Sequence, residues 1–323
     1  MRQISIEAIH DAAKHVYKAA IRTPLVKLDL PVTSNGGPEI YLKLESLQPI
    51  GSFKIRGAWN AVRKLTPAQL REGVWTVSAG NAAQGVALAA KLAGVPCSVM
   101  VIDTAPQTKL QSVERLGATI VKASYDECWQ TVESHSSPRM HGHFVHPFDD
   151  DDFIAGNATA GLEILEDLPD VDAVVAALGG GGLLGGIGTV MRAKKPGVRV
   201  YAAEPETAAP LHLSMQRGGP VRFEGWKPSF VDGAGGKSVL PSMWPILKAV
   251  VDDSIVMPLD QVVAAMRKTA ERIHVVAEGA AGTAIAAALS GRAGSGKIVA
   301  VVSGGNIDLG RFTELLAGTS TPK

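Results

Sequence analysis

One lysine of this sequence stands where an amine can act as a nucleophile. Lys54 lies in the stretch GSFKIRG, residues 51–57, between the apolar residues Phe53 and Ile55 and just before a predicted helix. A lysine removed from water has a lowered pKa, so part of it is the neutral, nucleophilic amine near neutral pH. The other interpretation is a surface lysine paired with a carboxylate, and these residues alone do not decide between the two.

A run of four glycines offers a binding site for a phosphate group. Gly179, Gly180, Gly181 and Gly182 follow a predicted strand and precede a predicted helix over residues 183–194. Glycine lets successive backbone N–H groups turn toward one point, and the helix behind them adds the positive end of its dipole. Because consecutive glycines weaken an ordinary turn, the run favours an anion site over a tight turn packed beneath a sheet.

The same glycines allow a second interpretation, a dinucleotide site. Gly180, Gly182 and Gly185 match G-x-G-x-x-G, and Glu204 ends the next strand, where an acidic residue that binds ribose is expected. An NAD-dependent oxidoreductase is therefore the main rival. Against it, that pattern usually opens its domain, whereas here a series of alternating strands and helices precedes it. It also leaves Lys54 without a role.

A polar loop joins a predicted strand over residues 74–77 to a predicted helix over residues 81–92. The loop residues Ser78, Ala79, Gly80 and Asn81 offer a hydroxyl, a bare backbone and an amide at the start of that helix. A helix N-terminus favours a carboxylate group, so this loop is a candidate for binding one. Taken alone it is more simply an ordinary helix cap, for which Ser and Asn are common.

Strands and helices alternate around these residues. This cadence predicts an α/β fold with parallel strands and helices on both faces of the sheet, and the strands are apolar runs, as expected when both faces are covered. We expect residues 141–152 to be an irregular passage and residues 204–242 to be mostly loop. The expected helices are 5–20, 57–65, 81–92, 108–116, 158–166, 183–194, 259–273 and 280–288; the expected strands are 40–44, 74–77, 98–102, 119–121, 173–178, 198–203 and 297–302.

Composition excludes several classes of protein. The 323 residues are 46% hydrophobic and 20% charged with a net charge of +1, so neither nucleic acid nor an acidic membrane surface is an expected partner. The two cysteines, Cys97 and Cys128, do not make a disulfide framework. The N-terminal helix has no apolar signal region and no apolar stretch is long enough to span a bilayer, so a cytoplasmic location is expected.

Taken together, the motifs resemble one family, the fold-type II enzymes that use pyridoxal 5′-phosphate (PLP), in the branch of serine/threonine dehydratases and serine racemases. The resemblance covers nearly the whole chain, from LESLQPIGSFKIRGAWNAV through SAGNAAQGVALAAKLAGV, HPFDDDDFIAGNAT, LGGGGLLGG and FVDGAGG to SGGN. It implies two parallel-sheet domains of the tryptophan synthase β-like kind. Residues 1–70 and 151–323 would form the large PLP-binding domain, and residues 71–150 the small substrate-loop domain.

The resemblance also implies a role for each candidate residue. Lys54 would hold the cofactor as a Schiff base and shuttle the Cα proton, while the carboxylate of the substrate would bind at the loop from Ser78 to Ala82. The implied cofactor-binding residues are Phe53 beside the pyridine ring, Asn81 at the phenolic oxygen, Gly179, Gly180, Gly181 and Gly182 at the phosphate, Ser303 at the pyridine nitrogen, and Gly233 and Glu278 around the site.

The sequence departs from this family at several positions. Ala79 replaces the second hydroxyl of racemases, which favours elimination, and Ala82 replaces the usual His, which makes room for larger substrates. Asn157 stands where Gln is more typical. Some members of the family bind a divalent cation through a glutamate, at the position of Glu204 here, and an aspartate six residues later. That later position is Pro210 in this sequence, so we expect no metal there. A cluster of His141, His143, His146 and Asp149–Asp152 is more simply solvated or structural than a metal site.

The implied activity is that of an ammonia-lyase. It would remove the β-hydroxyl of a 3-hydroxy amino acid such as L-threonine or L-serine and release a 2-oxo acid and ammonia. Racemisation and β-replacement remain alternatives within the fold type, although the motif SFKIRG argues against a synthase. A homodimer is the expectation of the family, and the sequence does not choose among serine, threonine and larger substrates.

Overall fold

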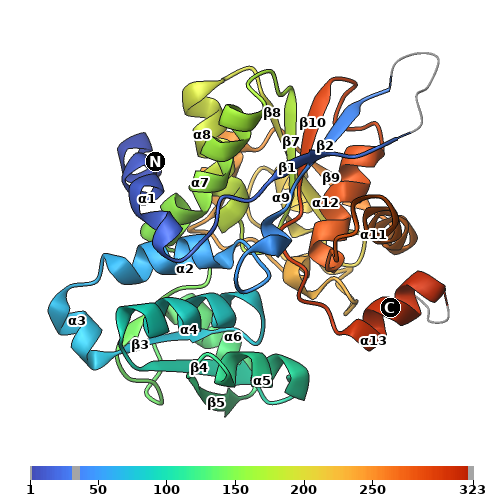
Figure 1. Cartoon of the computed structure of the whole chain (residues 1–323). Helices are drawn as coiled ribbons and strands as arrows, with labels where there is room; N and C mark the ends of the chain where they lie inside the picture. Colours follow the sequence, from blue (N-terminus) through green and yellow to red (C-terminus); the bar gives the residue numbers. More distant parts are fainter. Residues whose placement is uncertain (1, 31–36, 319–323) are drawn as a thin grey trace.

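The computed structural model describes residues 2–30 and 37–318, and two β-sheets organise that part of the chain (Figure 1). The larger sheet has six strands in the order β1-β2-β10-β7-β8-β9. Neighbouring strands are parallel, except that β1 runs antiparallel to β2 at the edge, which the sequence did not indicate. The strands are β1 (Leu25–Lys27), β2 (Glu39–Lys43), β7 (Ala173–Ala177), β8 (Arg199–Pro205), β9 (Asp253–Met257) and β10 (Lys297–Val301).

A smaller, fully parallel sheet has the order β5-β4-β3-β6. Its strands are β3 (Val74–Val77), β4 (Cys97–Ile102), β5 (Thr119–Ala123) and β6 (His143–Phe144), and the helices α4 (Asn81–Ala93), α5 (Gln107–Glu114) and α6 (Tyr125–Ser134) connect them. Figure 1 shows this sheet as a separate layered body below the larger one. All these elements lie within residues 71–150, the stretch that we propose as the small domain.

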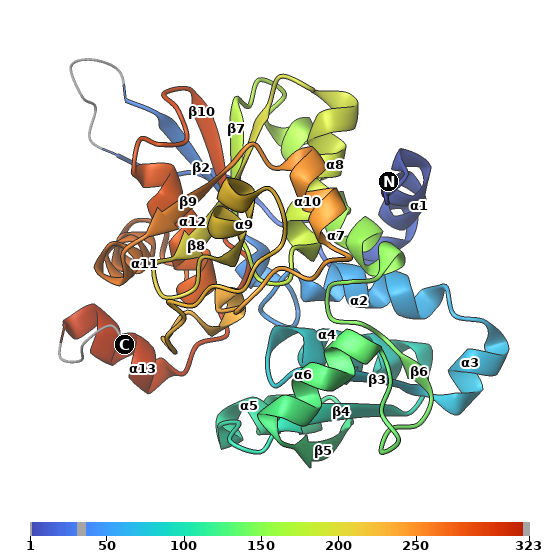
Figure 2. The same ribbon diagram turned by 180° about the vertical axis from the view of Figure 1, so that it is seen from behind.

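Helices cover both faces of the larger sheet, as its apolar strands predict. Along β7, Val174 and Ala176 pack toward α7 (Asp151–Asp167), α8 (Gly182–Lys194) and α10 (Trp244–Val250). Ala173 and Val175 point to the other face, where α11 (Leu259–Ile273) and α12 (Gly279–Leu289) lie (Figure 2). Apart from α2 (Lys54–Arg63), the remaining α-helices of the described residues are α1 (Ile6–His15), α3 (Pro67–Glu72), α9 (Pro210–Arg217) and α13 (Leu309–Ala317).

Helix α2 (Lys54–Arg63) packs against both bodies, on α7 of the large one and α4 of the small one. Glycines allow these close contacts. A Cβ atom at Gly156 of α7 would lie 2.3 Å from the carbonyl oxygen of Arg56, and one at Gly85 of α4 would lie 3.1 Å from that of Lys54. The lysine is therefore carried by the helix at which the two bodies meet.

Two segments are more ordered than their sequences suggested. Residues 141–152, expected to be irregular, contain β6 and the first residues of α7. Helix α7 begins here because the Asp150 carboxylate accepts a hydrogen bond from the N–H of Phe153 and caps the helix. Residues 204–242, expected to be mostly loop, contain α9, whose first turn is held by Glu204. In both, a side chain satisfies the backbone N–H groups at a helix start, which hydrophobic periodicity does not reveal.

Two other expected helices have different bounds. The helix expected over residues 5–20 ends at His15 and continues as a 3-10 turn, Val16–Lys18. The helix expected from Gly57 begins three residues earlier, so that Lys54 is its first residue. This places the candidate nucleophile at a fixed position on a helix rather than in the preceding loop.

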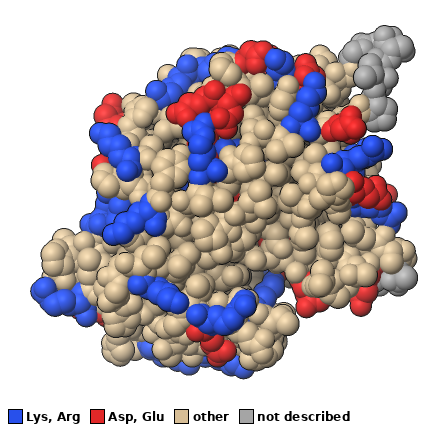
Figure 3. All heavy atoms as spheres, in the orientation of Figure 1, with Lys and Arg blue, Asp and Glu red and all other residues tan. Residues whose placement is uncertain are grey.

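The surface carries charges of both signs. On the face shown in Figure 3, Lys and Arg side chains are interspersed with Asp and Glu, in keeping with a net charge of +1 for the chain. Within the described residues, no helix has both the length and the apolar character that crossing a membrane requires.

Candidate active site

The candidate residues gather at the carboxyl ends of parallel strands. The loop beginning at Ser78 follows β3, the glycine run follows β7, and Ser303 follows β10. In α/β proteins these ends form the edge of the sheet at which ligands bind. Segments far apart in the sequence therefore meet beside α2, which begins with Lys54.

Lys54 is held in an apolar setting. Its Nζ lies 5.2 Å from the ring centre of Phe53 and 5.4 Å from that of Phe153, and it donates a hydrogen bond of 2.5 Å to the carbonyl oxygen of Pro147. Burial lowers the pKa of this amine to about 8, although the negative charge of Glu278 opposes the shift. Because its partner is a carbonyl and not a carboxylate, the geometry favours the nucleophile over the paired surface lysine.

The glycine run is packed too closely for side chains. A Cβ atom at Gly180 would lie 2.0 Å from the ring of Phe148, and one at Gly182 would lie 2.9 Å from the carbonyl oxygen of Phe148. Gly181 has a φ of +95°, a left-handed conformation that glycine adopts without strain. Gly182 is the first residue of α8, so the free N–H groups at the beginning of that helix lie in this loop. They form a cradle suited to a phosphate.

The loop before α4 keeps open space beside its backbone. Within the loop, the Ser78 hydroxyl accepts a hydrogen bond of 3.1 Å from the N–H of Gly80. A Cβ atom at Gly80 would meet no other atom within 4 Å, whereas Ala82 is buried, with 4% of its surface exposed. Ala79 lies half-buried between them. The start of α4 is thus accessible for a small anionic group such as a carboxylate.

Glu278 joins this loop to the end of β10. Asn81 Nδ2 donates a hydrogen bond of 2.8 Å to Glu278 Oε1, and the N–H of Asn306 donates one of 3.1 Å to Oε2. Asn306 Nδ2 also donates to Asn81 Oδ1 at 2.6 Å. Burial raises the pKa of the Glu278 carboxyl to about 8, and nearby Asp232 adds to the shift. Asn306 was not foreseen, although it ends the SGGN motif.

Phe53, Ser303 and Gly233 lie in the same region. The N–H of Phe53 donates a hydrogen bond of 3.0 Å to the carbonyl oxygen of Ser303, a residue only 4% exposed. The carbonyl oxygen of Gly233 would lie 2.6 Å from a Cβ atom at Gly179. A Cβ atom at Gly233 would in turn lie 3.4 Å from Glu278 Oε1. The structure thus brings the predicted site residues of all three segments together.

Glu204 does not serve the dinucleotide interpretation. Its side chain is fully buried, and its carboxylate accepts hydrogen bonds from the N–H groups of Leu211 and His212 at 2.8 and 2.7 Å and from the Ser254 hydroxyl. A carboxylate engaged in this way, at the start of α9, is not free to bind a ribose or a cation.

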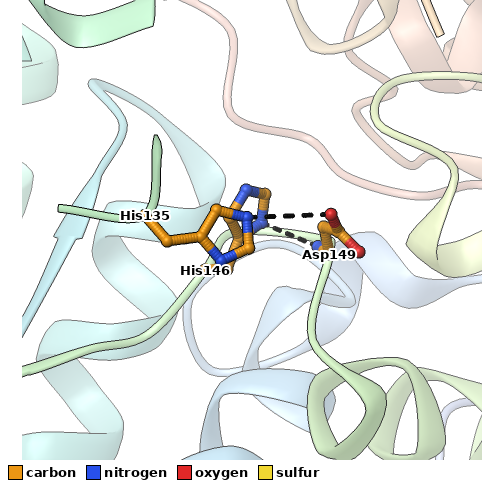
Figure 4. A group of neighbouring side chains, drawn as sticks. All are labelled: His135, His146 and Asp149. Carbon is orange, nitrogen blue, oxygen red and sulfur yellow. Dashed lines mark hydrogen bonds and ion pairs between the residues drawn. The ribbon is translucent and has the colours of Figure 1, made fainter. Parts of the chain in front are cut away.

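The histidines between the two bodies form a different cluster from the one that the sequence suggested. His146 and Asp149 lie with His135, and their potential ligand atoms are all within 4.8 Å of one another (Figure 4). His141 is exposed, and His143 Nδ1 lies 3.2 Å from Gln69 Nε2. His135 was missed because it lies in α6's C-terminal cap, outside the histidine-rich stretch.

The donor set fits one kind of cofactor. An amine whose pKa is lowered to about 8 can bond covalently to an aldehyde, and a glycine cradle at a helix N-terminus can hold a phosphate. Both features occur around the same site, as a phosphorylated aldehyde such as PLP requires.

Known proteins agree with this assignment. Residues 16–304 match the family described as pyridoxal-phosphate dependent enzyme. The L-threonine ammonia-lyase of Thermotoga maritima is 38% identical over 97% of this chain and 78% of its own length. The serine racemase of Dictyostelium discoideum is 33% identical over 98% of this chain and 99% of its own length. The structure of maize serine racemase superposes with a TM-score of 0.88 at 31% identity, over 98% of both chains. Since the family match spans most of the sequence, the chain belongs to the pyridoxal-phosphate-dependent enzymes.

Proposed function

We propose that this chain is a PLP-dependent ammonia-lyase that converts a 3-hydroxy amino acid, such as L-threonine or L-serine, to a 2-oxo acid and ammonia. The observation that carries the proposal is the Lys54 amine set near the rings of Phe53 and Phe153, in a site whose position 79 is an alanine. The site then has one amine base and no hydroxyl at position 79. Relatives named threonine ammonia-lyase support the same activity.

The residues of the site divide the work of holding the cofactor. Lys54 would hold its aldehyde carbon, and Gly179–Gly182 would hold its phosphate at the start of α8. Phe53, Asn81 and Ser303 would bind the ring, with Gly233 and Glu278 completing the surroundings. When bound, PLP supplies an electron sink for the pair released at Cα.

Lys54 would then move the protons. Its neutral amine takes the proton from Cα, and the ammonium so formed is an acid in the same site from which the departing hydroxyl can gain a proton. The Cα–H and Cβ–O bonds break and water leaves. The unsaturated amine that is released reacts with water to give the 2-oxo acid and ammonia.

Substrate binding would fall to the loop before α4. Ser78 and the backbone N–H groups of the loop and of the start of α4, from Ala79 to Ala82, would hold the carboxylate, at the positive end of the helix dipole. Because this loop belongs to the small body and Lys54 to α2, closure of the small body over the substrate would exclude water. A homodimer and a cytoplasmic location are part of the same proposal.

Racemisation is the second candidate, favoured by the relatives named serine racemase. A racemase needs an acid on the face of Cα opposite the lysine, and the side chain at position 79 is a methyl group. Elimination needs no such acid, so it is the reaction that these residues support better.

The test is the near-visible absorption spectrum of the purified protein beside its Lys54→Ala variant, with an assay of 2-oxo acid release from serine and threonine. We expect a yellow band and activity in the parent and neither in Lys54→Ala. Lys91→Ala, on the exposed side of α4, is the matched control and keeps both. A band that survives Lys54→Ala would remove Lys54 from this role, and a coloured parent that releases no 2-oxo acid would rule out elimination of these substrates.

A further inference from the structure

The short segment from His146 to Asp149 touches both halves of the proposed cofactor site. The carbonyl oxygen of Pro147 accepts the hydrogen bond from Lys54 Nζ at 2.5 Å. The ring and backbone of Phe148 fill the space where Gly180 and Gly182 would otherwise carry side chains. The position of this segment therefore determines where the amine is held and how the glycine cradle is shaped.

The imidazole of His146 organises the segment from within. Its Nδ1 accepts hydrogen bonds from the backbone N–H groups of Phe148 at 3.2 Å and Asp149 at 2.7 Å. Because two N–H donors face Nδ1, this nitrogen must be the acceptor, and the ring hydrogen must lie on Nε2, 3.2 Å from the carbonyl oxygen of Val132. With 2% of its surface exposed, the ring is buried and neutral, and burial lowers its pKa to about 3.

Asp149 anchors the far end of the segment. Its carboxylate pairs with Arg2 and accepts a hydrogen bond of 2.5 Å from the Ser242 hydroxyl. The ring of His135 lies tilted by 40° beside that of His146, with ring centres 4.6 Å apart, and its Nε2 lies 3.8 Å from Asp149 Oδ2 (Figure 4). Since Nδ1 of His146 and the Asp149 carboxylate already have protein partners, the cluster is built as a support for the turn and not as an open metal site.

We propose that His146 is a positioning residue for cofactor capture. By holding the N–H groups of Phe148 and Asp149, it presents the Pro147 carbonyl to the Lys54 amine and presses Phe148 against the glycine cradle. The amine is thereby held in place whenever it is not bonded to the cofactor, and the cradle keeps the shape that a phosphate requires. This inference rests on the assignment of Lys54 in the proposed function.

Two matched substitutions separate the roles of the two ring nitrogens. In His146→Asn, the side-chain oxygen can stand near the position of Nδ1 and accept from the same N–H groups. In His146→Gln, the amide reaches the position of Nε2 and can keep the contact with Val132, but the acceptor for Phe148 and Asp149 is lost. The measurements on the full chain are the dissociation constant of PLP and the rate at which the near-visible band appears after PLP is added to protein freed of it.

We expect His146→Gln to weaken PLP binding about tenfold and to slow the appearance of the band, because two buried N–H groups lose their partner. His146→Asn should stay within about threefold of the parent in both measurements. His135→Gln is the control and should match the parent, because His135 neighbours His146 but accepts from neither N–H group.

Equal loss in His146→Asn and His146→Gln, or parent-like capture by His146→Gln, would overturn the inference. Circular dichroism establishes whether each variant is folded. If His146→Gln is not folded, the Asn variant decides, because weaker PLP binding by a folded His146→Asn contradicts the role of Nδ1 as the acceptor. A parent that shows no Lys54-dependent band is a failure of the proposed function instead, so the two failures are distinguishable.

Discussion

Asn81 and Glu278 are 197 residues apart in the sequence, yet Asn81 Nδ2 donates a 2.8 Å hydrogen bond to Glu278 Oε1. Asn81 begins α4 in the small body and Glu278 precedes α12 in the large one, so this bond links the two bodies at the proposed site. The bond is made to a carboxyl whose pKa burial raises to about 8. Near neutral pH the link therefore involves mainly the protonated, uncharged acid, which a buried position tolerates.

Stability should depend on the charge of Glu278. Its folded-state pKa of about 8 lies above the ordinary value of 4.5, so between these values the folded chain keeps a proton that the unfolded chain has lost. The contribution of this group to the free energy of unfolding is complete below pH 4.5 and is lost as the pH rises from 4.5 to about 8. Denaturant unfolding across that range should show a shallower decline in Glu278→Gln than in the parent. Identical slopes in parent and variant would contradict the assignment.

The glycine cradle should not tolerate one added methyl group at position 180. A Cβ atom there would lie 2.0 Å from the ring of Phe148, so Gly180→Ala must displace Phe148 or the loop. We expect a loss of about 1–3 kcal/mol in the free energy of unfolding, as for other overpacked sites, together with weaker PLP binding. Gly197→Ala is the matched control, because a Cβ atom at Gly197 meets nothing within 4 Å. Unchanged stability and affinity in Gly180→Ala would mean that the contact with Phe148 does not shape the cradle.

Local patterns predicted the parts of the site that are local. The glycine run, the lysine in an apolar stretch and the loop before α4 could be recognised because each is a short sequence at the junction of a strand or helix. The parallel sheets followed from the alternation of apolar strands with helices. The reason is that neighbours along the chain determine turns, caps and periodicity.

Residues whose roles depend on distant partners could not be found in this way. Asn306 contacts Asn81 across 225 residues, and the Pro147 carbonyl meets Lys54 across 93. His135 joins His146 only because the end of α6 packs near the segment before α7. One partner of the Glu204 carboxylate, Ser254, likewise comes from another strand. Such contacts are set by the packing of the sheets and not by spacing.

The balance between elimination and racemisation should depend on the side chain at position 79. Ala79 is half-buried, so its side chain is not enclosed on all sides. In Ala79→Ser we expect the rate of racemisation of L-serine to rise relative to 2-oxo acid release, because the new hydroxyl can exchange a proton on the face of Cα opposite Lys54. Chiral chromatography of recovered serine measures the extent of racemisation. Ala79→Gly, which adds no acid, is the control, and equal ratios in the Ser and Gly variants would contradict the explanation.

Position 82 should set the size of the substrate side chain. Ala82 lies in the first turn of α4, next to Asn81, and is 4% exposed, so the residue faces the interior and not the solvent. The imidazole usual in this family is absent there, and we expect the parent to release 2-oxo acid from 3-hydroxy amino acids bulkier than threonine. In Ala82→His the added ring should narrow the site and lower kcat/KM for a bulky substrate about tenfold or more relative to serine, since the loss of a buried fit costs on the order of 1–3 kcal/mol. Ala82→Ser adds one polar atom and little volume, so it is the control for replacing Ala82 without adding a large side chain. Strict preference of the parent for serine and threonine would show that other residues limit the site.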